Sequence, residues 1–250
     1  MSALLRTEDV RKAYGGVHAL DSCTVDVEEG SVAGLIGPNG SGKTTLFNVI
    51  TGYAKADAGQ VYLAGQQITN IAPDKVFGLG IGRTFQLTRI FARLTVLENM
   101  LVASRHRRSA ARKHAMEQLE FVGIAGHHAE LAGTLSYGQR KLLELAYVLV
   151  ADPAVILLDE PAGGINLSLV NHIAGRIREL NAAGKTFLIV EHNMEFVMGL
   201  CDRVTVLDSG AVVAAGPPAI IRTDRRVLDA YLGEDLDPQA PDDPESAEDA

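Results

Sequence analysis

The sequence contains little cysteine: Cys23 and Cys201 are its two thiols in 250 residues. They form neither a C-x-x-C pair nor the spacing of a zinc site, which argues against a disulfide scaffold and a structural zinc. A chain of this length buries roughly 70–75% of the surface that its unfolded form exposes, so its core needs no such support. We expect both thiols to be buried in a protein of a reducing compartment.

Long apolar runs are also missing from the sequence. The best candidate for a membrane span, Leu142–Leu158, is interrupted by Glu144, Asp152 and Pro153, whereas a spanning helix needs roughly 18 consecutive apolar residues. The first residues lack the basic segment and apolar stretch that mark a secretory signal. We therefore expect a chain that does not cross a membrane itself and that stays in the cytosol.

Basic residues are absent from the C-terminal segment 234–250, which holds eight acidic residues and three prolines. The formal net charge of −8 therefore belongs to this segment, and residues 1–233 are formally neutral. Segments with high net charge and few apolar residues cannot bury enough surface to fold. We predict a globular domain at 1–233 followed by a disordered acidic tail at 234–250.

Three short apolar segments predict the centre of the fold: Val32–Ile36, Val155–Leu158 and Thr186–Val190. None of them alternates polar with apolar residues, which favours strands covered on both faces in a largely parallel sheet. Helical patterns lie between and beside these strands, at Lys43–Thr51, Thr95–Ser104, Ser109–Val122, Gly138–Ala151 and Leu167–Asn181. Strands that alternate with helices indicate an α/β fold.

Further segments predict additions to this core. The first 30 residues and Gln60–Ala64 have the pattern of short strands, which suggests an added antiparallel sheet, and Arg203–Ala215 has the pattern of a hairpin. Residues 95–151 are almost wholly helical in pattern. We expect a helical subdomain at about 87–151 that is inserted into the α/β core.

A glycine-rich loop follows the first of the buried strands and opens a helix. It matches G-x-x-x-x-G-K-[ST] and comprises Gly37, Pro38, Asn39, Gly40, Ser41, Gly42, Lys43, Thr44 and Thr45. In such a loop, successive backbone N–H groups and the helix N-terminus converge on phosphate oxygens. Lys43 adds a positive charge at the β- and γ-phosphates, and the Thr44 hydroxyl can ligate Mg²⁺. The loop predicts a nucleotide site.

Two adjacent carboxylates, Asp159 and Glu160, come at the end of the buried strand. Ligands of open parallel sheets collect at the carboxyl ends of the strands, where these acids lie. Asp159 suits the Mg²⁺ shell opposite Thr44, and Glu160 is placed to act as general base on an attacking water. Taken alone, the pair could equally belong to a helix cap or a solvated loop, but the phosphate loop upstream favours the catalytic interpretation.

One further segment precedes an amphipathic helix and comprises Leu135, Ser136, Tyr137, Gly138 and Gln139. Locally it predicts a capping box, with Ser136 as the N-cap and Gln139 at the third helical position.

The order of these motifs along the chain is also informative. The chain runs from the phosphate loop to Gln86, then to Leu135–Gln139 (LSYGQ), Leu157–Glu160 (LLDE) and His192. The ATP-binding cassette (ABC) ATPases have the same order of motifs, and the chain closely resembles that family over about residues 3–233. The resemblance implies a P-loop NTPase core that hydrolyses ATP with Mg²⁺, and it implies a signature role for residues 135–139.

Several residue roles follow from this resemblance. Tyr14 stands where such cassettes place an aromatic ring against adenine, although a tyrosine beside glycines is by itself more often a packing residue. Gln86 matches the glutamine that reaches Mg²⁺ and the water, and it begins the segment that contacts the transmembrane partner. His192 matches the histidine that hydrogen-bonds the γ-phosphate. Asn166 stands where the family usually has aspartate, so a carboxylate role there is in doubt.

The chain has one phosphate loop and one signature segment. In the family, the signature serine and its helix N-terminus act on nucleotide that the opposite subunit holds, so the resemblance implies a head-to-tail dimer with a second copy or a similar cassette. ATP then bridges Lys43 and His192 of one chain to Ser136, Gly138 and Gln139 of the other.

Among ABC proteins, the resemblance favours a transporter motor over a soluble ATPase that works on DNA ends or ribosomes. Those ATPases have two cassettes in one chain or a long coiled-coil insertion, whereas only 50 residues separate Gln86 from Ser136. The chain resembles the ATPases of bacterial branched-chain amino acid importers, whose relatives also carry urea or short amides. The resemblance lies in residues 82–86, 94–99, 160–166 and 230–233. Lipopolysaccharide-exporter ATPases are the alternative.

The resemblance also implies partners and a location. The expected partners are transmembrane permease subunits, a second cassette and, indirectly, a substrate-binding protein, on the cytoplasmic side of the bacterial inner membrane. The one basic cluster, Arg105–Arg108 with Arg112 and Lys113, has no interleaved aromatic residues. It favours a solvated helix face or contact with anionic headgroups over a nucleic-acid site.

Overall fold

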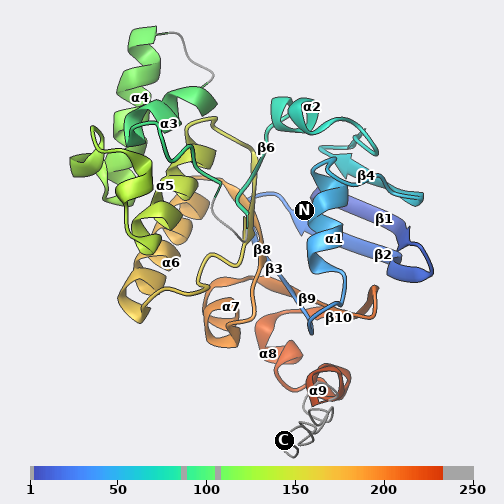
Figure 1. The fold of residues 1–250 in the computed structure, drawn as a ribbon. Coiled ribbons are helices and arrows are strands. Elements are labelled where there is room, and N and C mark those ends of the chain that lie inside the picture. Colours follow the sequence, from blue (N-terminus) through green and yellow to red (C-terminus); the bar gives the residue numbers. More distant parts are fainter. Residues whose placement is uncertain (1–2, 86–88, 105–107, 233–250) are drawn as a thin grey trace, which may run out of the picture.

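The computed structural model describes residues 3–85, 89–104 and 108–232. Figure 1 shows a central sheet with a block of helices on one side and a smaller sheet on the other. The predicted α/β class is therefore confirmed. Gln86, part of the basic cluster (105–107) and the acidic segment 234–250 lie outside the described residues.

The central sheet has six strands in the order β10-β9-β3-β8-β7-β6. Their bounds are Val32–Ile36 (β3), Ile81–Arg83 (β6), Val155–Asp159 (β7), Thr186–Val190 (β8), Arg203–Asp208 (β9) and Ala211–Gly216 (β10). Neighbours from β9 to β6 pair in parallel, and β10 returns antiparallel to β9. Every residue of β3, β7 and β8 is buried, as their unbroken apolar patterns predict.

The second sheet is antiparallel and has the order β2-β1-β4-β5. Its strands are Ala3–Tyr14 (β1), Val17–Glu28 (β2), Ala58–Leu63 (β4) and Gln66–Gln67 (β5). Together with helix α1 (Lys43–Ile50) it covers one face of the central sheet, because Leu20, Val61 and Phe47 share a single apolar cluster with Leu35 and Leu188. The added antiparallel sheet is confirmed.

Helices cover the other face of the central sheet. The larger ones are α3 (Val96–Ala103), α4 (Arg108–Val122), α5 (Tyr137–Leu149) and α6 (Leu167–Ala182), and two short 3₁₀ turns, η1 (Ala125–His127) and η2 (Ala132–Thr134), link α4 to α5. Leu143 of α5 and Ile173 of α6 belong to the same cluster as Ile156 and Ile189 of the sheet. The block α3–α5 occupies the region that the sequence predicts to be helical (Figure 1).

Four short helices are not predicted from the sequence: α2 (Pro73–Gly78), α7 (Met194–Leu200), α8 (Pro218–Ile221) and α9 (Arg225–Leu232). Segments of four to eight residues are too short to show a helical period reliably. Strand β6 ends at Arg83, and Phe85 N–H, two residues further on, donates to Glu144 Oε1 at 2.8 Å.

None of the helices in the described ranges has the length and apolarity that crossing a bilayer requires. Cys23 and Cys201 are buried, and burial raises the pKa of each thiol to about 12. Both cysteines are thus buried, as expected.

Candidate functional site

The phosphate loop connects β3 to α1, and its backbone admits only glycine at two positions. Gly37 has φ 149° and Gly42 has φ 104°. A Cβ atom at Gly37 would lie 2.0 Å from the carbonyl oxygen of Leu207, and one at Gly42 would lie 2.4 Å from that of Ala19. The pattern G-x-x-x-x-G is therefore a packing requirement as well as a phosphate-binding motif.

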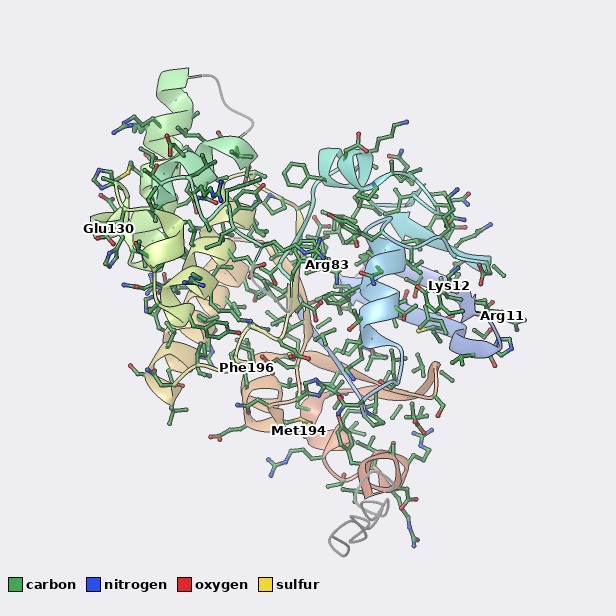
Figure 2. The ribbon with its side chains drawn as sticks, in the orientation of Figure 1. Arg11, Lys12, Arg83, Glu130, Met194 and Phe196 are labelled. Atoms are coloured by element: carbon green, nitrogen blue, oxygen red, sulfur yellow. The ribbon has the colours of Figure 1, made fainter. Side chains whose placement is uncertain are left out.

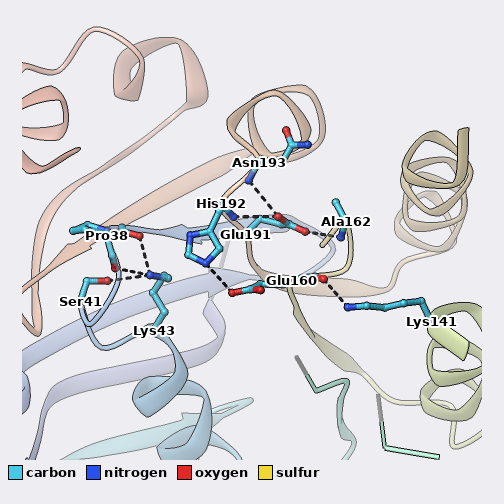
Figure 3. Close-up of polar contacts among 10 residues, drawn as sticks. Pro38, Ser41, Lys43, Lys141, Glu160, Ala162, Glu191, His192 and Asn193 are labelled. Atoms are coloured by element: carbon cyan, nitrogen blue, oxygen red, sulfur yellow. Dashed lines mark hydrogen bonds and ion pairs between the residues drawn. The ribbon is translucent and has the colours of Figure 1, made fainter. Parts of the chain in front are cut away.

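Lys43 is buried at the start of α1 and folds back over its own loop. Its Nζ donates to the carbonyl oxygens of Gly37 at 2.8 Å and Pro38 at 2.7 Å, and to Ser41 Oγ at 3.3 Å (Figure 3). The ammonium group is thus positioned inside the concave side of the loop. Phosphate oxygens that enter the loop meet this charge together with the N-terminus of α1.

Residues from four distant segments line one hollow of about 240 Å³ beside the loop. They are Ala19, Asn39, Gly40, Gly42, Lys43, Thr44, Thr45, Glu160 and His192. Glu160 follows β7 and His192 lies just past β8, and these two strands are parallel neighbours. Their carboxyl ends therefore meet at the same edge of the sheet, which places both side chains beside the loop.

Glu160 and His192 are in direct contact in this hollow. Glu160 Oε1 lies 2.7 Å from His192 Nε2 (Figure 3). The backbone of Glu160 is left-handed, with φ 49°, a conformation that is unfavourable for a residue with a side chain. Two hydrogen bonds maintain it: Glu160 N–H donates to the carbonyl of Val190 at 2.9 Å, and Lys141 Nζ donates to the carbonyl of Glu160 at 2.8 Å.

Asp159, the residue before, lies deeper in the protein and does not line this hollow. Its Oδ2 pairs with Arg83 Nη2 at 3.0 Å, and both side chains are almost fully buried. Burial raises the pKa of the Asp159 carboxyl, and the Arg83 guanidinium counteracts that shift. Arg83 also donates to Asn48 Oδ1 and Thr51 Oγ1 of the α1 region.

The oxygen donors at this edge suit Mg²⁺, which prefers carboxylate and hydroxyl ligands. Thr44 supplies a hydroxyl at the hollow, and the described contact of Arg83 engages only one oxygen of Asp159. Gln86, the third expected ligand, lies outside the described residues. The residues present therefore fit a magnesium ion, which Thr44 and Asp159 would help to hold.

The signature segment lies at the N-terminus of α5 and forms the predicted capping box. Gln139 N–H donates to Ser136 Oγ at 3.3 Å, and Ser136 N–H donates to Gln139 Oε1 at 2.9 Å. Leu135 is buried, whereas Ser136 and Tyr137 are exposed. A hollow of about 690 Å³, separate from the phosphate-loop hollow, is lined by Ser136, Tyr137, Gly138 and Gln139 together with residues that include 164–166 and His172. Within one chain, the structure keeps the signature and the phosphate loop apart.

Tyr14 is the last residue of β1 and is 52% exposed. Lys12 Nζ lies 5.1 Å from its ring centroid, and Tyr14 is absent from the residues that line the phosphate-loop hollow. Its ring is therefore open to a flat partner, which leaves the adenine role as a prediction.

Asn166 is the N-cap of α6: its Oδ1 accepts from Leu169 N–H at 2.9 Å. Asparagine and aspartate cap helices equally well. The exchange relative to the usual family motif therefore keeps the cap and changes only the charge beside the signature.

Sequence reasoning missed a buried carboxylate next to His192. Glu191 Oε1 accepts from Ala162 N–H at 2.5 Å, and its Oε2 accepts from the N–H groups of His192 and Asn193 (Figure 3). Burial raises the pKa of Glu191. The side chain ties the segment after β8 to the segment after β7, and an acid inside the run Val190-Glu191-His192 was the available signal.

Comparisons with known proteins agree with this geometry. The family profile described as ABC transporter matches residues 20–163. A second profile, described as branched-chain amino acid ATP-binding cassette transporter, matches residues 211–237.

Two relatives illustrate the similarity. A probable branched-chain amino acid transport ATP-binding protein LivG of Methanocaldococcus jannaschii is 37% identical over 251 residues, which cover 92% of this chain and 98% of the relative. The high-affinity branched-chain amino acid transport ATP-binding protein LivG of Escherichia coli K12 is 35% identical with the same coverage.

Solved structures give the same result. The ADP conformation of MJ1267, an ATP-binding cassette of an ABC transporter, aligns with a TM-score of 0.85 at 36% identity and covers 93% of this chain and 100% of that chain. A dimeric post-hydrolysis state of the cassette MJ0796, bound to ADP and Pi, aligns with a TM-score of 0.77 at 27% identity, with 86% and 98% coverage.

These matches confirm the resemblance to the branched-chain amino acid group that the sequence motifs indicate. The ABC transporter profile covers more than half of the chain, and the relatives are matched over nearly their whole length. With its phosphate loop, capped signature helix and paired Glu160 and His192, the chain belongs to the ABC transporter family as an ATP-binding cassette.

Proposed function

We propose that this chain is the ATP-hydrolysing motor subunit of a membrane ABC importer for branched-chain or related amino acids. The observation that carries the proposal is the convergence of Lys43, Glu160 and His192 on one hollow at the carboxyl edge of a parallel sheet. The relatives described as branched-chain amino acid transport ATP-binding proteins support the cargo class.

The geometry supports a direct hydrolytic role for each of these side chains. Lys43 and the loop N–H groups bind the triphosphate, and Glu160 accepts a proton from the water that attacks the γ-phosphorus. His192, which contacts Glu160 through Nε2, orients that carboxylate and reaches the γ-phosphate. Thr44, Asp159 and Gln86 would hold Mg²⁺, which neutralises charge on the β- and γ-phosphates when bound.

The second half of the reaction centre comes from another cassette. The exposed Ser136 and the N-terminus of α5 face a hollow of their own, and a helix N-terminus favours an anion. The dimeric structure of the similar cassette MJ0796 with ADP and Pi supports this arrangement. ATP then links two protomers, identical or different, and hydrolysis removes the link.

A groove of about 460 Å³ offers a docking site for the permease. It lies between the α2 region and the helical block, and its lining includes Tyr53, Phe77, Phe85, Phe91 and Val102. Four of these apolar side chains are at least one-third exposed: Tyr53, Phe77, Phe91 and Val102. Because Phe85 and Arg89 flank the Gln86 segment and line this groove, a permease segment seated here would contact residues adjoining the ATP site.

Similarity at the C-terminus favours import over the lipopolysaccharide-export alternative. Residues 211–237, which include β10, α8 and α9, match the profile of branched-chain amino acid cassettes. We infer a peripheral position on the cytoplasmic side of the membrane, with a substrate-binding protein on the far side of the permease. The domain at 1–233, its helical subdomain at about 87–151 and the acidic tail remain part of this proposal.

Transport by a reconstituted complex tests the function. The cassette is purified with the permease subunits encoded beside it, placed in proteoliposomes with ATP inside, and supplied outside with the binding protein and labelled leucine, isoleucine or valine. ATP-dependent uptake that is lost in Glu160→Gln supports the proposal. The exporter would be favoured if the complex assembles and hydrolyses ATP but releases lipid instead of taking up the labelled amino acids.

A further inference from the structure

A chain of three hydrogen bonds runs from the signature segment to the turn η1. Ser136 N–H donates to Gln139 Oε1 at 2.9 Å, Gln139 Nε2 lies 2.9 Å from His127 Nε2, and His127 Nδ1 lies 2.9 Å from Glu130 Oε1. Gln139 lines the signature hollow, whereas His127 and Glu130 do not. His127 is therefore a supporting residue behind the surface that meets the partner's nucleotide.

The chemistry of the groups sets the direction of each bond. A backbone N–H can only donate, so the atom of Gln139 that faces Ser136 is its carbonyl oxygen. The amide –NH₂ of Gln139 must then donate to His127 Nε2, which accepts through its lone pair. The proton of the neutral ring therefore lies on Nδ1, where it is donated to the Glu130 carboxylate.

Protonation of His127 breaks this order. With protons on both ring nitrogens, Nε2 faces the –NH₂ group of Gln139 donor to donor. If the amide rotates to offer its oxygen to His127, the –NH₂ group turns toward Ser136 N–H, and the clash is moved rather than removed. The chain therefore loses one bond in either case: the Gln139–His127 contact if the amide keeps its orientation, or the Ser136–Gln139 bond of the capping box if the amide rotates.

Two neighbouring histidines do not share this property. His128 Nδ1 bonds the carbonyl oxygen of Ala125 at 3.0 Å, and His172 Nε2 bonds the carbonyl oxygen of Val122 at 3.0 Å. A ring nitrogen that faces a carbonyl already carries its proton, so a second proton on the ring leaves the bond in place. Among these three side chains, His127 is the one whose described contact to the signature requires a lone pair.

The charged groups around His127 come from its own turn and from the packed helices. Glu130 contacts its ring, and α4, which packs against η1, carries Glu117 and Glu120. Glu117 is paired with Lys113 and His114. Glu98 of α3 accepts a hydrogen bond from Thr95, and Arg140 of α5 donates to the carbonyls of Gly133 and Leu135. Of these described groups, Glu130 is the charged one in contact with the ring.

We propose that His127 is a positioning residue of the ATPase reaction, whose neutral ring orients Gln139 and whose protonation weakens nucleotide-driven dimerisation. The inference rests on the proposed function, because the signature segment acts on nucleotide held by a second cassette. Histidine ordinarily changes charge between pH 5 and 8, so dimerisation is expected to weaken as the pH falls through this range.

The test measures the ATP concentration that gives half-maximal dimerisation, by light scattering on the Glu160→Gln variant with Mg²⁺ at pH 8 and pH 6. This variant is the parent, and His127→Gln is added to it because the introduced amide oxygen accepts from Gln139 and does not titrate. Between pH 8 and pH 6, we expect the half-maximal ATP concentration to rise roughly three- to tenfold more in the parent than in the His127→Gln variant, the effect of about one hydrogen bond. His127→Ala should dimerise weakly at both pH values.

His128→Gln is the matched control and should keep the pH dependence of the parent. The phosphate-loop hollow is the same in every variant, so its contribution cancels in the comparison, and thermal unfolding at pH 8 verifies that each variant is folded. Equal pH dependence in the parent and in His127→Gln overturns the role of His127 while leaving the proposed function intact. Failure of the parent itself to dimerise at pH 8 overturns both.

Discussion

The phosphate loop and the signature helix, the two halves of the proposed reaction centre, are stabilised in different ways. Backbone geometry shapes the loop, because Gly37 and Gly42 have left-handed φ values and no space for a Cβ atom. Side-chain hydrogen bonds shape the signature, through Ser136, Gln139 and His127 at a largely exposed surface. Figure 2 labels Glu130, the carboxylate that contacts His127, in the helical block.

This difference indicates which properties of the protein should change when residues in each region are substituted. The loop is surrounded by its own chain, so its geometry exists before any partner arrives. In the proposed dimer the signature faces a second protomer, and its few side-chain bonds are individually weak. Substitutions in and beside the loop should therefore have the largest effects on ATP binding and hydrolysis. Substitutions in the signature should have graded effects on dimerisation.

The largest effect is expected for Glu160→Gln, which removes the proton acceptor but keeps the shape. ATP turnover should fall about 10²–10⁴-fold, the usual contribution of a general base, while ATP binding persists and a nucleotide-trapped dimer accumulates. Phosphate release and light scattering measure the two properties. Turnover at the wild-type rate would show that another group activates the water.

A smaller but still large effect is expected for Lys43→Ala. Loss of a charged donor to the phosphates should weaken ATP binding roughly 10- to 100-fold, since such bonds contribute about 1.5–3 kcal/mol. Calorimetry measures the affinity, with Lys75→Ala on the exposed surface of α2 as control. Unchanged affinity would contradict the phosphate-loop assignment. The two regions would then not differ in the way proposed above.

A graded effect is expected for Ser136→Ala. Loss of the N-cap should cost about 0.5–2 kcal/mol of stability and weaken ATP-driven dimerisation, while ATP binding by the monomer is unchanged. Thr95→Ala removes a similar capping box from α3 and is the matched control, because it should lower stability without changing dimerisation. Equal effects of the two variants on dimerisation would reduce the signature serine to a structural cap.

The smallest effect is expected for Asn166→Asp. Both residues cap α6, so the free energy of unfolding should change by less than about 0.5 kcal/mol. Asn166→Ala removes the cap and should destabilise the protein by more. Thermal unfolding of the three proteins measures this. A large change with aspartate would show that charge, rather than capping, sets the geometry beside the signature.

Much of the fold could be predicted because its signals are local. The limits of β3 and β8 agree with the predicted strands residue for residue, since a fully buried strand leaves an unbroken apolar run. The capping box of Ser136 and Gln139 was predicted from a spacing of three residues. The short helices α2, α7 and α8 escaped prediction because they span barely more than one or two turns.

Contacts between segments far apart in the chain could not be predicted in the same way. The Asp159 partner Arg83 is 76 residues away, and the Gln139 partner His127 belongs to a turn that has no motif. Glu191 was overlooked because the N–H groups that donate to it come from two strand ends that only folding brings together.

The sequence by itself determined the phosphate loop, the two acids at the end of β7, the capped signature helix and the family, since each depends on residue types at short spacing. Only the tertiary structure decided that Glu160 meets His192, that Arg83 pairs with Asp159, and that the signature hollow lies apart from the loop. The physical reason is that local patterns follow from backbone geometry, whereas contacts between strand ends depend on which strands lie side by side in the sheet.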